Sequence, residues 1–510
     1  MSNFSIKLKV KKVSITAGKL IVVLNPKDAA ELSVVPNDRI ELTTSSGKSV
    51  VCIIDVSDSF IQQGAIGLFE EVSNVLKVKE GSVVSVKFVS TLESLEFIKK
   101  KMDGLVLSEQ EINQIVKDLN EGKLSEIEAS AFISSVYING FNLEETVAMT
   151  KALIANGNKL KIDKSPIVDK HSVGGTNGRA SMIIVPILAA GGFYCPKTSS
   201  RSITSSSGTA DSMEVLAPVS LSVDQIKNIT KKVGGVIAWG GAVALAPADD
   251  KIIKLEHPLS LDPEGQVIAS VMAKKAAVGS EYVVIDIPVG VNVKIKSREK
   301  AVSMAKKFVA VGKELGMQVE AVITNGNEPS GPAFGPALES KHALMIMEGK
   351  LFDNLAQKSC ELAGVIFEMI GKSKKDEGFR HAKALLEEGS ALKKFNEIVA
   401  AQGGKPKSSD QIAFGKFSHD VVAHEDGEIS GLSIKVLTKI ARLAGAPGDK
   451  YAGVWLNYSV GDKVKKGNII YKIYSNSKAK LDASVSFCEK VNPVVMEKII
   501  LEKIREIYFV

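Results

Sequence analysis

The first ninety residues alternate apolar and polar positions in the way that β-strands do. Turns of Pro-Asn-Asp, Ser-Ser-Gly and Glu-Gly separate four such segments: KLIVVLN, DRIELTT, SVVCIIDV and SVVSVKFV. The period of two arises because successive side chains of a strand point to opposite faces. The pattern predicts a small, mostly β domain over residues 1–90.

From about residue 93 the apolar positions recur with the period of a helix. One such face consists of Ile112, Ile115, Val116 and Leu119. Three capping signatures each open an amphipathic stretch: Ser108 with Glu111, Ser125 with Glu128, and Asn142 with Glu145. A helical region therefore follows the β domain.

After residue 164 strand-like and helix-like segments alternate, which is the pattern of an α/β fold. The expected strands are PIVDK, GGVIAWG, EYVVIDIPVG and QVEAVITNG, and the expected helices are AVSMAKKFVAVGKEL and ALESKHALMIMEG. Polar connectors lie at 371–378 and 400–410. The last ninety residues return to β character, with a hairpin predicted over VGDKVKKGNIIYKIYS and a closing helix over MEKIILEKIREI.

The composition is that of a globular protein. A chain of 510 residues, 45% hydrophobic and 24% charged, has room for several domains of ~150 residues each. The net charge of +7 comes from 65 basic and 58 acidic residues spread along the chain, and aromatic residues make up only 5%. No nucleic-acid signature appears, so we expect no nucleic-acid partner. The mild positive bias favours an anionic substrate.

The cysteines and histidines do not indicate a metal site. The four cysteines are far apart, no CxxC pair occurs, and the six histidines are dispersed, so neither a zinc site nor a disulfide framework is expected. The first residues, MSNFSIKLKVKK, lack the apolar region of a signal peptide, and no apolar run is long enough to span a bilayer. We expect no membrane association and a cytoplasmic location.

A glycine-rich loop follows the first strand of the α/β region, in PIVDKHSVGGTNGRASMIIVPILAAG (166–191). A strand, a glycine loop and a helix N-terminus together form an anion site, because glycines let backbone amides approach the ligand and the helix dipole favours negative charge. Lys170, Ser172 and Ser181 add charge and donors. An ordinary tight turn is an equal alternative, since the loop is neither a Walker A sequence nor a GxGxxG fingerprint.

The next loop repeats this arrangement. In KTSSRSITSSSGTAD (197–211) nine of fifteen residues carry hydroxyls, and TADSMEVL opens a helix with Thr209 and Asp211 near its start. Two consecutive loops of this kind converge at the carboxyl edge of one sheet, where α/β folds bind ligands. The alternative for any single serine is a hydrogen bond to its own turn, but nine hydroxyls exceed what turns need.

A third segment, residues 239–280, holds five candidate acids or metal ligands: Asp249, Asp250, Glu256, Asp262 and Glu264. Ser270, Lys274 and Lys275 follow at helical spacing. An Asp-Asp pair is more often a solvated loop or a helix cap than a metal site, and composition does not choose among these acids.

Five segments resemble the thymidine phosphorylase/AMP phosphorylase family of nucleoside phosphorylases: DKHSVGG, KTSSRSITSSSGTAD, WGGAVALAPADD, LSLDPEGQVIASVMAKK and IDIPVG. The resemblance is to the longer branch, the archaeal AMP phosphorylases and the bacterial type 2 thymidine phosphorylases, and includes their N-terminal β extension. In that family phosphate attacks C1′ of a nucleoside or nucleotide and expels the base. The resemblance therefore implies a pentosyltransferase with inorganic phosphate as co-substrate, no metal and no other cofactor.

The resemblance also assigns residues. Asp262 corresponds to the proton donor. The phosphate-binding positions of thymidine phosphorylases match Lys170, Ser172, Ser181, Ser199 and Thr209. The nucleotide-contacting positions of AMP phosphorylases match Gly174, Ser200, Arg201, Ser202, Ile203, Thr204, Ser205, Thr209, Ser270 and Lys294. The hydroxyls of residues 197–211 would then bind oxyanions and ribose, and His171 would contact base or phosphate or orient the loop.

The resemblance does not identify the substrate as directly as it identifies the reaction. Pyrimidine-specific members read the base with an arginine, and an ungapped count back from Ser270 puts Leu255 at that position. We therefore expect phosphorolysis of nucleoside 5′-monophosphates, AMP and also CMP or UMP, to free base and ribose 1,5-bisphosphate, with Lys294, Arg201 or Lys274 available for the 5′-phosphate. Because Lys170 and Ser181 follow the thymidine phosphorylase pattern, a thymidine or pyrimidine nucleoside phosphorylase is the alternative.

The resemblance implies a multidomain α/β protein in four parts. These are an N-terminal β domain (1–90), a helical domain (93–163, completed by about 265–279), a large phosphate-binding α/β domain with a mixed sheet (164–400) and a C-terminal α+β domain (411–510). Family members form homodimers through the helical domain, and some assemble further. A Mg²⁺-dependent phosphotransferase is a rival enzyme class. A biotinyl-like or lipoyl-like binding module is a non-catalytic rival, although the C-terminal hairpin lacks the attachment lysine.

Overall fold

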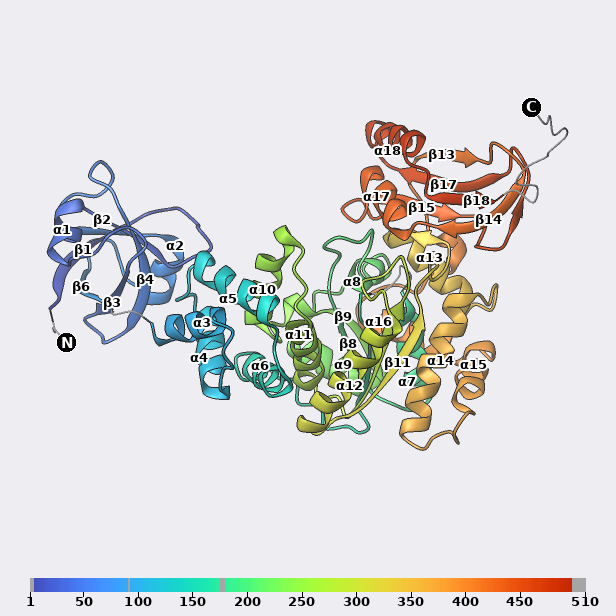
Figure 1. The fold of residues 1–510 in the computed structure, drawn as a ribbon, viewed down its shortest axis with the longest axis horizontal. Helices are drawn as coiled ribbons and strands as arrows, with labels where there is room; N and C mark the ends of the chain where they lie inside the picture. The colour runs from blue at the N-terminus through green and yellow to red at the C-terminus, as the bar shows by residue number, and fades with distance from the viewer. Residues whose placement is uncertain (1–3, 90–91, 175–178, 498–510) are drawn as a thin grey trace, which may run out of the picture. The chain divides into compact units, whose positions relative to one another are not determined.

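The computed structural model describes residues 4–89, 92–174 and 179–497. The chain divides into two compact units. One unit comprises Met1–Gly157 with Ala246–Ser270, and the other comprises Asn158–Leu245 with Val271–Val510. Figure 1 shows the elements of both units along the chain. In the part of the chain that the structure describes, no helix combines the length and the apolar character needed to cross a membrane.

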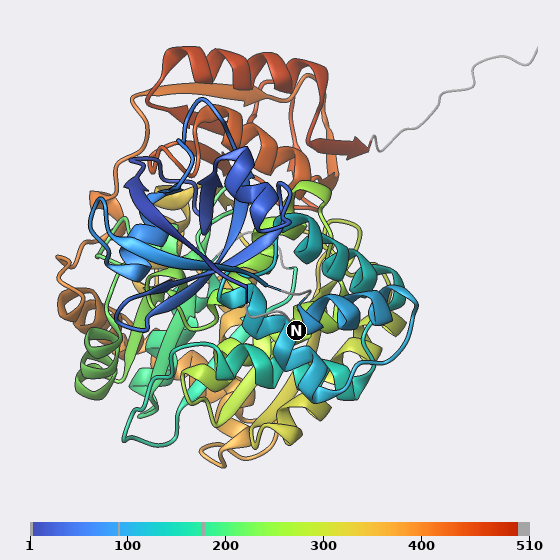
Figure 2. The ribbon, with the colours of Figure 1, turned by 90° about the vertical axis from the view of Figure 1, so that its left-hand side faces the viewer.

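The first unit begins with a closed β-barrel, which confirms the predicted β domain and is drawn in blue in Figure 2. Its strands pair in the order β1-β5-β2-β4-β3-β6. Alternate residues point inward, so that Ile40 and Leu42 of β3 are fully buried. The elements are β1 (Ile6–Lys12), β2 (Ile21–Leu24), α1 (Pro26–Glu31), β3 (Arg39–Thr44), β4 (Ser49–Val56), β5 (Ala65–Leu68), α2 (Glu70–Leu76) and β6 (Val83–Phe88).

Helices complete the first unit, and all three predicted capping boxes are present at their N-termini. The predicted apolar face of α4, from Ile112 to Leu119, is buried as expected. Lys251 of α10 donates to the carbonyl of Asn120 (2.8 Å), so α10 closes the end of α4. The elements are α3 (Glu93–Met102), α4 (Glu109–Asn120), α5 (Glu126–Asn139), α6 (Leu143–Ala155), α10 (Pro247–Glu256), η2 (His257–Leu259) and the start of α11 (Glu264–Ala277).

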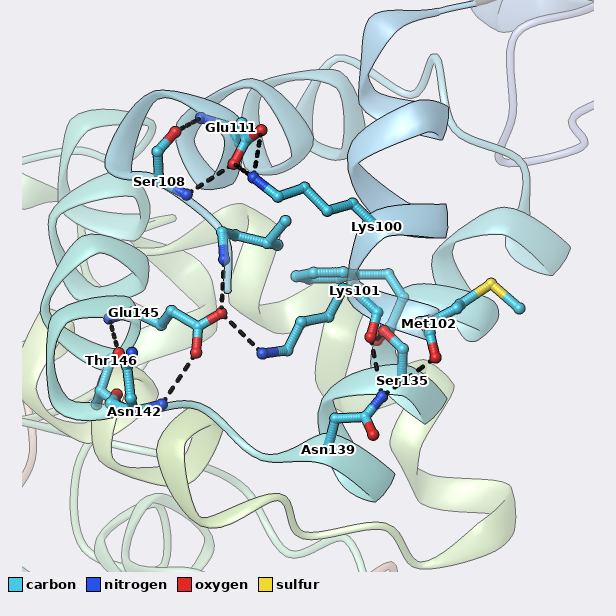
Figure 3. A network of polar contacts seen from close by, with 12 residues as sticks. Lys100, Lys101, Met102, Ser108, Glu111, Ser135, Asn139, Asn142, Glu145 and Thr146 are labelled. Atoms are coloured by element: carbon cyan, nitrogen blue, oxygen red, sulfur yellow. Dashed lines mark hydrogen bonds and ion pairs between the residues drawn. The ribbon is translucent and has the colours of Figure 1, made fainter. Parts of the chain in front are cut away.

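A buried ion pair connects α3 to α6 (Figure 3). Lys101 Nζ lies 2.7 Å from Glu145 Oε1, and each side chain is only 2% exposed. Glu145 also accepts hydrogen bonds from the backbone amides of Leu107 (2.9 Å) and Asn142 (3.0 Å). Because a buried carboxylate is stable only when its lone pairs are satisfied, Glu145 fixes where α3, its following loop and α6 meet.

The second unit contains the expected α/β region. β7, β10 and β11 form a parallel sheet in the order β11-β10-β7, and β8 pairs in parallel with β9. A parallel bridge between Ile167 and Tyr194 links these two groups. The strands are β7 (Val168–Ser172), β8 (Cys195–Ser199), β9 (Gly235–Trp239), β10 (Tyr282–Val289) and β11 (Gln318–Asn325). Their mutual pairings are parallel, whereas β12 (Ala333–Phe334) pairs antiparallel with β15 (Gly453–Leu456).

Helices cover this sheet, and α7 is its most buried element. Residues Ala180 to Ala189 of α7 are all buried, and Pro186 lies within the helix. The helices are α7 (Ala180–Ala190), α8 (Thr209–Met213), α9 (Val223–Val233), η1 (Gly240–Ala242), α12 (Arg298–Glu314), α13 (Pro336–Met347), α14 (Asn354–Met369), α15 (Gly378–Glu387) and α16 (Ser390–Ala401). The multidomain α/β architecture is confirmed.

The C-terminal segments form two antiparallel sheets, in the orders β12-β15-β17-β13 and β16-β14-β18. The predicted hairpin over VGDKVKKGNIIYKIYS is wrong, because β16 pairs with β14 whereas β17 pairs with β13 and β15. Met496 and Glu497, expected to begin a helix, belong to β18, and the rest of that expected helix lies outside the described residues. The elements are η3 (Ser409–Gln411), β13 (Phe417–Val422), β14 (Gly427–Leu432), α17 (Ile434–Ala444), β15, β16 (Lys463–Val464), β17 (Ile469–Ser475), α18 (Lys478–Lys490) and β18 (Val494–Glu497).

Substitution of Glu145 by Gln tests the buried ion pair. The variant leaves the ammonium of Lys101 buried without its counter-charge, so we expect the free energy of unfolding to fall by about 3–5 kcal/mol. The matched control is Glu96→Gln, which removes the exposed pair between Glu96 and Lys99 (both 63% exposed) and is expected to cost less than about 1 kcal/mol. Urea denaturation of the two variants measures both values, and equal losses would contradict a special role for the buried pair.

Candidate active site

The carboxyl ends of β7 and β8 open into one cavity of about 360 Å³. Residues of both predicted loops line it, which confirms that the two loops converge at one edge of the sheet. Helices α7 and α8 begin at this edge. The cavity walls include all five predicted phosphate-binding residues: Lys170, Ser172, Ser181, Ser199 and Thr209.

Behind the cavity, Asp169 holds two lysines. Asp169 is fully buried on β7 and accepts hydrogen bonds from Lys275 Nζ (2.5 Å) and Lys197 Nζ (3.2 Å). Burial by itself would raise the pKa of Asp169, but the two ammonium groups outweigh it and keep that pKa below its usual value. Lys197 also donates to the carbonyl of Lys170 (2.7 Å), so this hub fixes the backbone of β7 at the cavity.

A second carboxylate, Asp286 of β10, holds two more lysines. Its Oδ2 lies 2.9 Å from Lys358 Nζ and 3.9 Å from Lys170 Nζ. Ser172 Oγ (2.5 Å) and Thr324 Oγ1 (2.6 Å) donate to the same carboxylate. The register explains the contact, because Asp286 stands directly opposite Ser172 on neighbouring parallel strands.

The two groups of lysines, one around Asp169 and one around Asp286, leave positive charge at the cavity. Four amino groups share two carboxylates, so two positive charges are unbalanced within the cluster when all four are protonated. Burial lowers the pKa of Lys170 to about 7, although Asp286 partly opposes the shift. An anion bound beside Lys170 supplies the missing negative charge, and so the arrangement is suited to bind a phosphate dianion.

His171 lies in the same wall but does not add charge. Its side chain is buried, and burial together with Lys275 and Lys197 holds its pKa well below the usual histidine value. The imidazole is therefore neutral near pH 7, which leaves it able to orient the loop or meet a neutral group.

The hydroxyl side chains of residues 199–209 differ in whether they bond within the loop. The hydroxyl of Ser202 bonds to the carbonyl of Ser205, the hydroxyl of Ser205 donates to the carbonyl of Ser207 (2.8 Å), and that of Ser207 contacts Ser212 Oγ (2.8 Å). The alternative of local turn bonding therefore holds for Ser202, Ser205 and Ser207. Ser202, Ser205 and Ser207 line the cavity together with Ser199, Ser200 and Thr209, and the last three are the potential ligand donors.

Gly208 is required where this loop turns into α8. A Cβ at this position would lie 2.6 Å from the carbonyl oxygen of Ser200 and 2.7 Å from the amide nitrogen of Ser202. Both are backbone atoms, which cannot give way without moving the loop. Asp211 tightens the same turn by accepting from the amides of Ser202 (2.7 Å) and Gly208 (2.8 Å).

Arg201 is tied to this scaffold. Its guanidinium donates to Glu214 Oε1 (2.6 Å) and to Asp211 Oδ1 (3.2 Å), and it stacks over the ring of Trp239 at 4.9 Å. Hydrogen bonding by Arg201 lowers the pKa of Glu214 to about 2. The positive charge of Arg201 is therefore balanced by Glu214 and Asp211. This balance disfavours the expectation that Arg201 binds a substrate 5′-phosphate.

Gly174 and Lys294, both predicted substrate contacts, lie together. The amide of Lys294 donates to the carbonyl of Gly174 (3.4 Å). Gly174 has a φ of +61°, and a Cβ there would lie 2.7 Å from Cβ of Lys294. Only glycine therefore allows the stem of Lys294 to pass so close to the loop. Ile203 and Thr204, the remaining predicted contacts of the second loop, also line the cavity.

Asp262 and Ser270 belong to the other unit. Asp262 lies between η2 and α11. Ser270 Oγ donates to the buried carboxylate of Asp249 (2.7 Å), which also accepts from Gln266 Nε2 (3.3 Å). Asp249 thus anchors α10 to α11. Among the described residues, no group of three or more His, Cys, Asp or Glu side chains is arranged to hold a metal ion.

The sequence analysis did not single out the two carboxylates that hold the lysines, Asp169 and Asp286, nor two of the lysines, Lys197 and Lys358. Lys275 was noted only for its helical spacing and not for its contact with Asp169. A signal for one of them was present, because Asp286 interrupts the otherwise apolar strand EYVVIDIPVG, and an acid in a buried strand needs a partner. Nothing in the sequence shows that Lys275 and Lys358, from two distant helices, reach the same strand ends.

Comparisons with known proteins agree with this geometry. Three family models match: the helical bundle domain of the glycosyl transferase family at residues 95–157, its a/b domain at 164–392, and the pyrimidine nucleoside phosphorylase C-terminal domain at 429–493. An AMP phosphorylase of Methanococcus vannielii is 43% identical over 500 residues, covering 98% of this chain and 99% of the relative. AMP phosphorylase 1 of Archaeoglobus fulgidus is 44% identical over 497 residues, covering 97% and 98%.

A solved structure shares part of the fold. Anthranilate phosphoribosyltransferase (TrpD) from Thermus thermophilus superposes with a TM-score of 0.51 at 19% identity, covering 60% of this chain and 99% of that protein. At this identity the likeness concerns the fold alone.

The pKa of Lys170 predicts how anion binding depends on pH. Below pH 7 the ammonium is charged and attracts the anion, and above pH 7 the free protein loses this charge. We therefore expect the affinity for sulfate, whose own charge is constant in this range, to fall at least about tenfold between pH 6.5 and 8.5. Calorimetry measures this profile. Lys170→Arg keeps its charge and should flatten the profile, and a flat profile in the unmodified protein would contradict the assignment.

Proposed function

The chain belongs to the glycosyl transferase family together with the AMP phosphorylases, and on that premise we propose that it cleaves the N-glycosidic bond of nucleoside 5′-monophosphates with inorganic phosphate. AMP is the foremost substrate, and CMP and UMP are further candidates. The products are the free base and ribose 1,5-bisphosphate. The observation that carries the proposal is the lysine cluster around Asp169 and Asp286 beside the cavity, whose unbalanced positive charge matches a phosphate dianion.

In the proposed reaction a phosphate oxygen forms a bond to C1′ while the bond from C1′ to the base nitrogen breaks. The electron pair of the broken bond stays on the base, and a proton from Asp262 neutralises it. General acid catalysis of this kind typically contributes about 10²–10⁴-fold. The phosphate needs no general base, because it is already an anion. It needs positioning, which Lys170 and the hydroxyls of Ser181 and Thr209 provide, while the hydroxyl of Ser172 is donated to Asp286.

A thymidine or pyrimidine nucleoside phosphorylase, giving base and a (deoxy)ribose 1-phosphate, is the alternative function. Leu255, at the position where pyrimidine-specific relatives carry an arginine, lies within α10 and supplies no base-reading hydrogen bond. We further propose that the enzyme acts in the cytoplasm and needs neither a metal nor an organic cofactor, since the lysines offer the positive charge that the reaction demands.

We also propose that the protein is a homodimer or a higher homo-oligomer formed through the helical domain. Helix α5 presents apolar side chains to solvent, among them Ile127 (81% exposed), Ile138 (76%) and Tyr137 (55%). Met102, Leu105 and Val106 are likewise more than half exposed in the same unit. Large apolar side chains exposed on one domain are typical of a subunit interface.

Substrate screening tests the proposed function. The protein is incubated with phosphate and, separately, with AMP, CMP, UMP, adenosine, uridine and thymidine, and free base is separated by chromatography. We expect adenine from AMP, in proportion to added phosphate and undiminished by EDTA. Release of thymine from thymidine with no release from AMP would establish the alternative.

Asp262→Asn is the control for this screen. It should reduce base release by at least about 10²-fold while leaving sulfate affinity unchanged, because Asp262 is not part of the lysine cluster. Undiminished turnover would contradict its role as proton donor.

Ile138→Asp tests the interface. A charge placed in a buried apolar contact is strongly unfavourable, so we expect the variant to be monomeric by sedimentation velocity. Val291→Asp is the matched control, since Val291 is equally exposed (76%) but lies in the other unit. An unchanged sedimentation coefficient for Ile138→Asp would show that any assembly uses another surface.

A further inference from the structure

Helix α17, in the C-terminal part of the chain, forms part of the substrate cavity. Ile434 and Thr438 line the cavity, and Arg442 follows one turn later on the same face of the helix. Arg442 Nη1 donates to the carbonyls of Ser205 (2.9 Å) and Ile203 (3.2 Å). Both acceptors belong to the serine-rich loop, so Arg442 stands at the rim of the cavity against that loop.

The charge of Arg442 differs from that of the other arginines near the cavity. Arg179 is paired with the buried carboxylate of Glu339, and Arg201 is paired with Asp211 and Glu214. Within the described residues, Arg442 has no carboxylate partner, and its two hydrogen bonds go to neutral carbonyls. It therefore keeps a full positive charge in an exposed side chain.

The proposed reaction requires two anion sites. Inorganic phosphate needs one beside C1′, and the 5′-phosphate of the nucleotide needs another. The lysine cluster of Asp169 and Asp286 supplies a single concentration of positive charge at the strand ends. The loop from Ser200 to Ser205 lines the cavity and also reaches Arg442, and so its backbone connects the cavity to a second cationic group.

The guanidinium of Arg442 has further N–H groups that can donate to a ligand. Toward the residues that the structure describes, only Nη1 is engaged, which leaves Nε and Nη2 as a parallel pair of donors, the arrangement that binds a phosphate group in a bidentate manner. The bonds from Nη1 to the loop would hold the guanidinium in place for such a contact.

We propose that Arg442 binds the 5′-phosphate of the substrate and thereby selects nucleotides over nucleosides. This inference rests on the proposed function and names the residue that decides its substrate class. It also assigns the C-terminal domain a direct role in substrate selection. Lys294, beside Gly174 on the other loop, is a separate contact that this role does not replace.

The experiment compares Arg442→Met with Arg442→Lys and with Lys435→Met, an exposed cation on the same helix. Binding of AMP and of adenosine is measured by calorimetry without inorganic phosphate, so that no turnover occurs, and the KM for phosphate is measured separately. For Arg442→Met we expect AMP to bind about 10- to 100-fold more weakly, the size expected for a lost charged hydrogen bond. Adenosine affinity and the KM for phosphate should be unchanged. Arg442→Lys should recover part of the AMP affinity, and Lys435→Met should resemble the unmodified protein.

Two outcomes would overturn the inference. Equal weakening of AMP and adenosine would show that Arg442 only holds the loop, and unchanged AMP affinity would show that it takes no part. Thermal melting confirms that each variant is folded. Failure of the proposed function is recognised separately, as the absence of base release from AMP by the unmodified protein, and the ratio of AMP to adenosine affinity still decides the role of Arg442.

Discussion

The burial of four lysines around two aspartates on neighbouring parallel strands is the constraint on which the rest of this structure depends. Taking these charges out of water is costly, and the pairings of Asp169 and Asp286 offset that cost only in part, because the positive groups outnumber the negative ones. Burial is the main reason that the pKa of Lys170 is lowered, and the neighbouring ammonium groups of Lys358 and Lys197 lower it further. A site of this kind is completed by an anionic ligand, so that the binding of phosphate and the integrity of the strand ends are coupled.

The two loops around the cavity leave the lysine cluster accessible to a ligand and determine the shape of the cavity. Gly208 lets the second loop fold against its own backbone, and Asp211 satisfies the amides that the turn would otherwise leave open. The hydroxyls of Ser202, Ser205 and Ser207 form hydrogen bonds within the loop and its following helix. These bonds fix the loop that carries the other donors, Ser199, Ser200 and Thr209. Preorganised donors of this kind stabilise developing charge without reorganisation during the reaction.

Charge balance also separates structural cations from functional ones. Arg179 and Arg201 have carboxylate partners and shape the walls, whereas Lys170 and Arg442 carry charge that the protein does not neutralise completely. In the helical unit the buried pair of Lys101 and Glu145 is fully matched and satisfied by backbone amides, which is consistent with a purely structural role. Whether a cation is fully paired with carboxylates, rather than whether it is lysine or arginine, distinguishes structural cations from functional ones.

The sequence by itself determined the elements whose cause is local. The period of two in the barrel, the capping boxes of α4, α5 and α6, and the two loops at the carboxyl ends of β7 and β8 all depend on neighbouring residues, and each was predicted. Strand pairing near the C-terminus was not, since β16 and β17 take partners far away in the chain. Only the tertiary structure decided that Lys275 and Lys358 meet the strands that carry Asp169 and Asp286, and that Arg442 reaches the serine loop. These contacts join residues separated by long stretches of chain, and no local pattern of hydrophobic and polar positions encodes them.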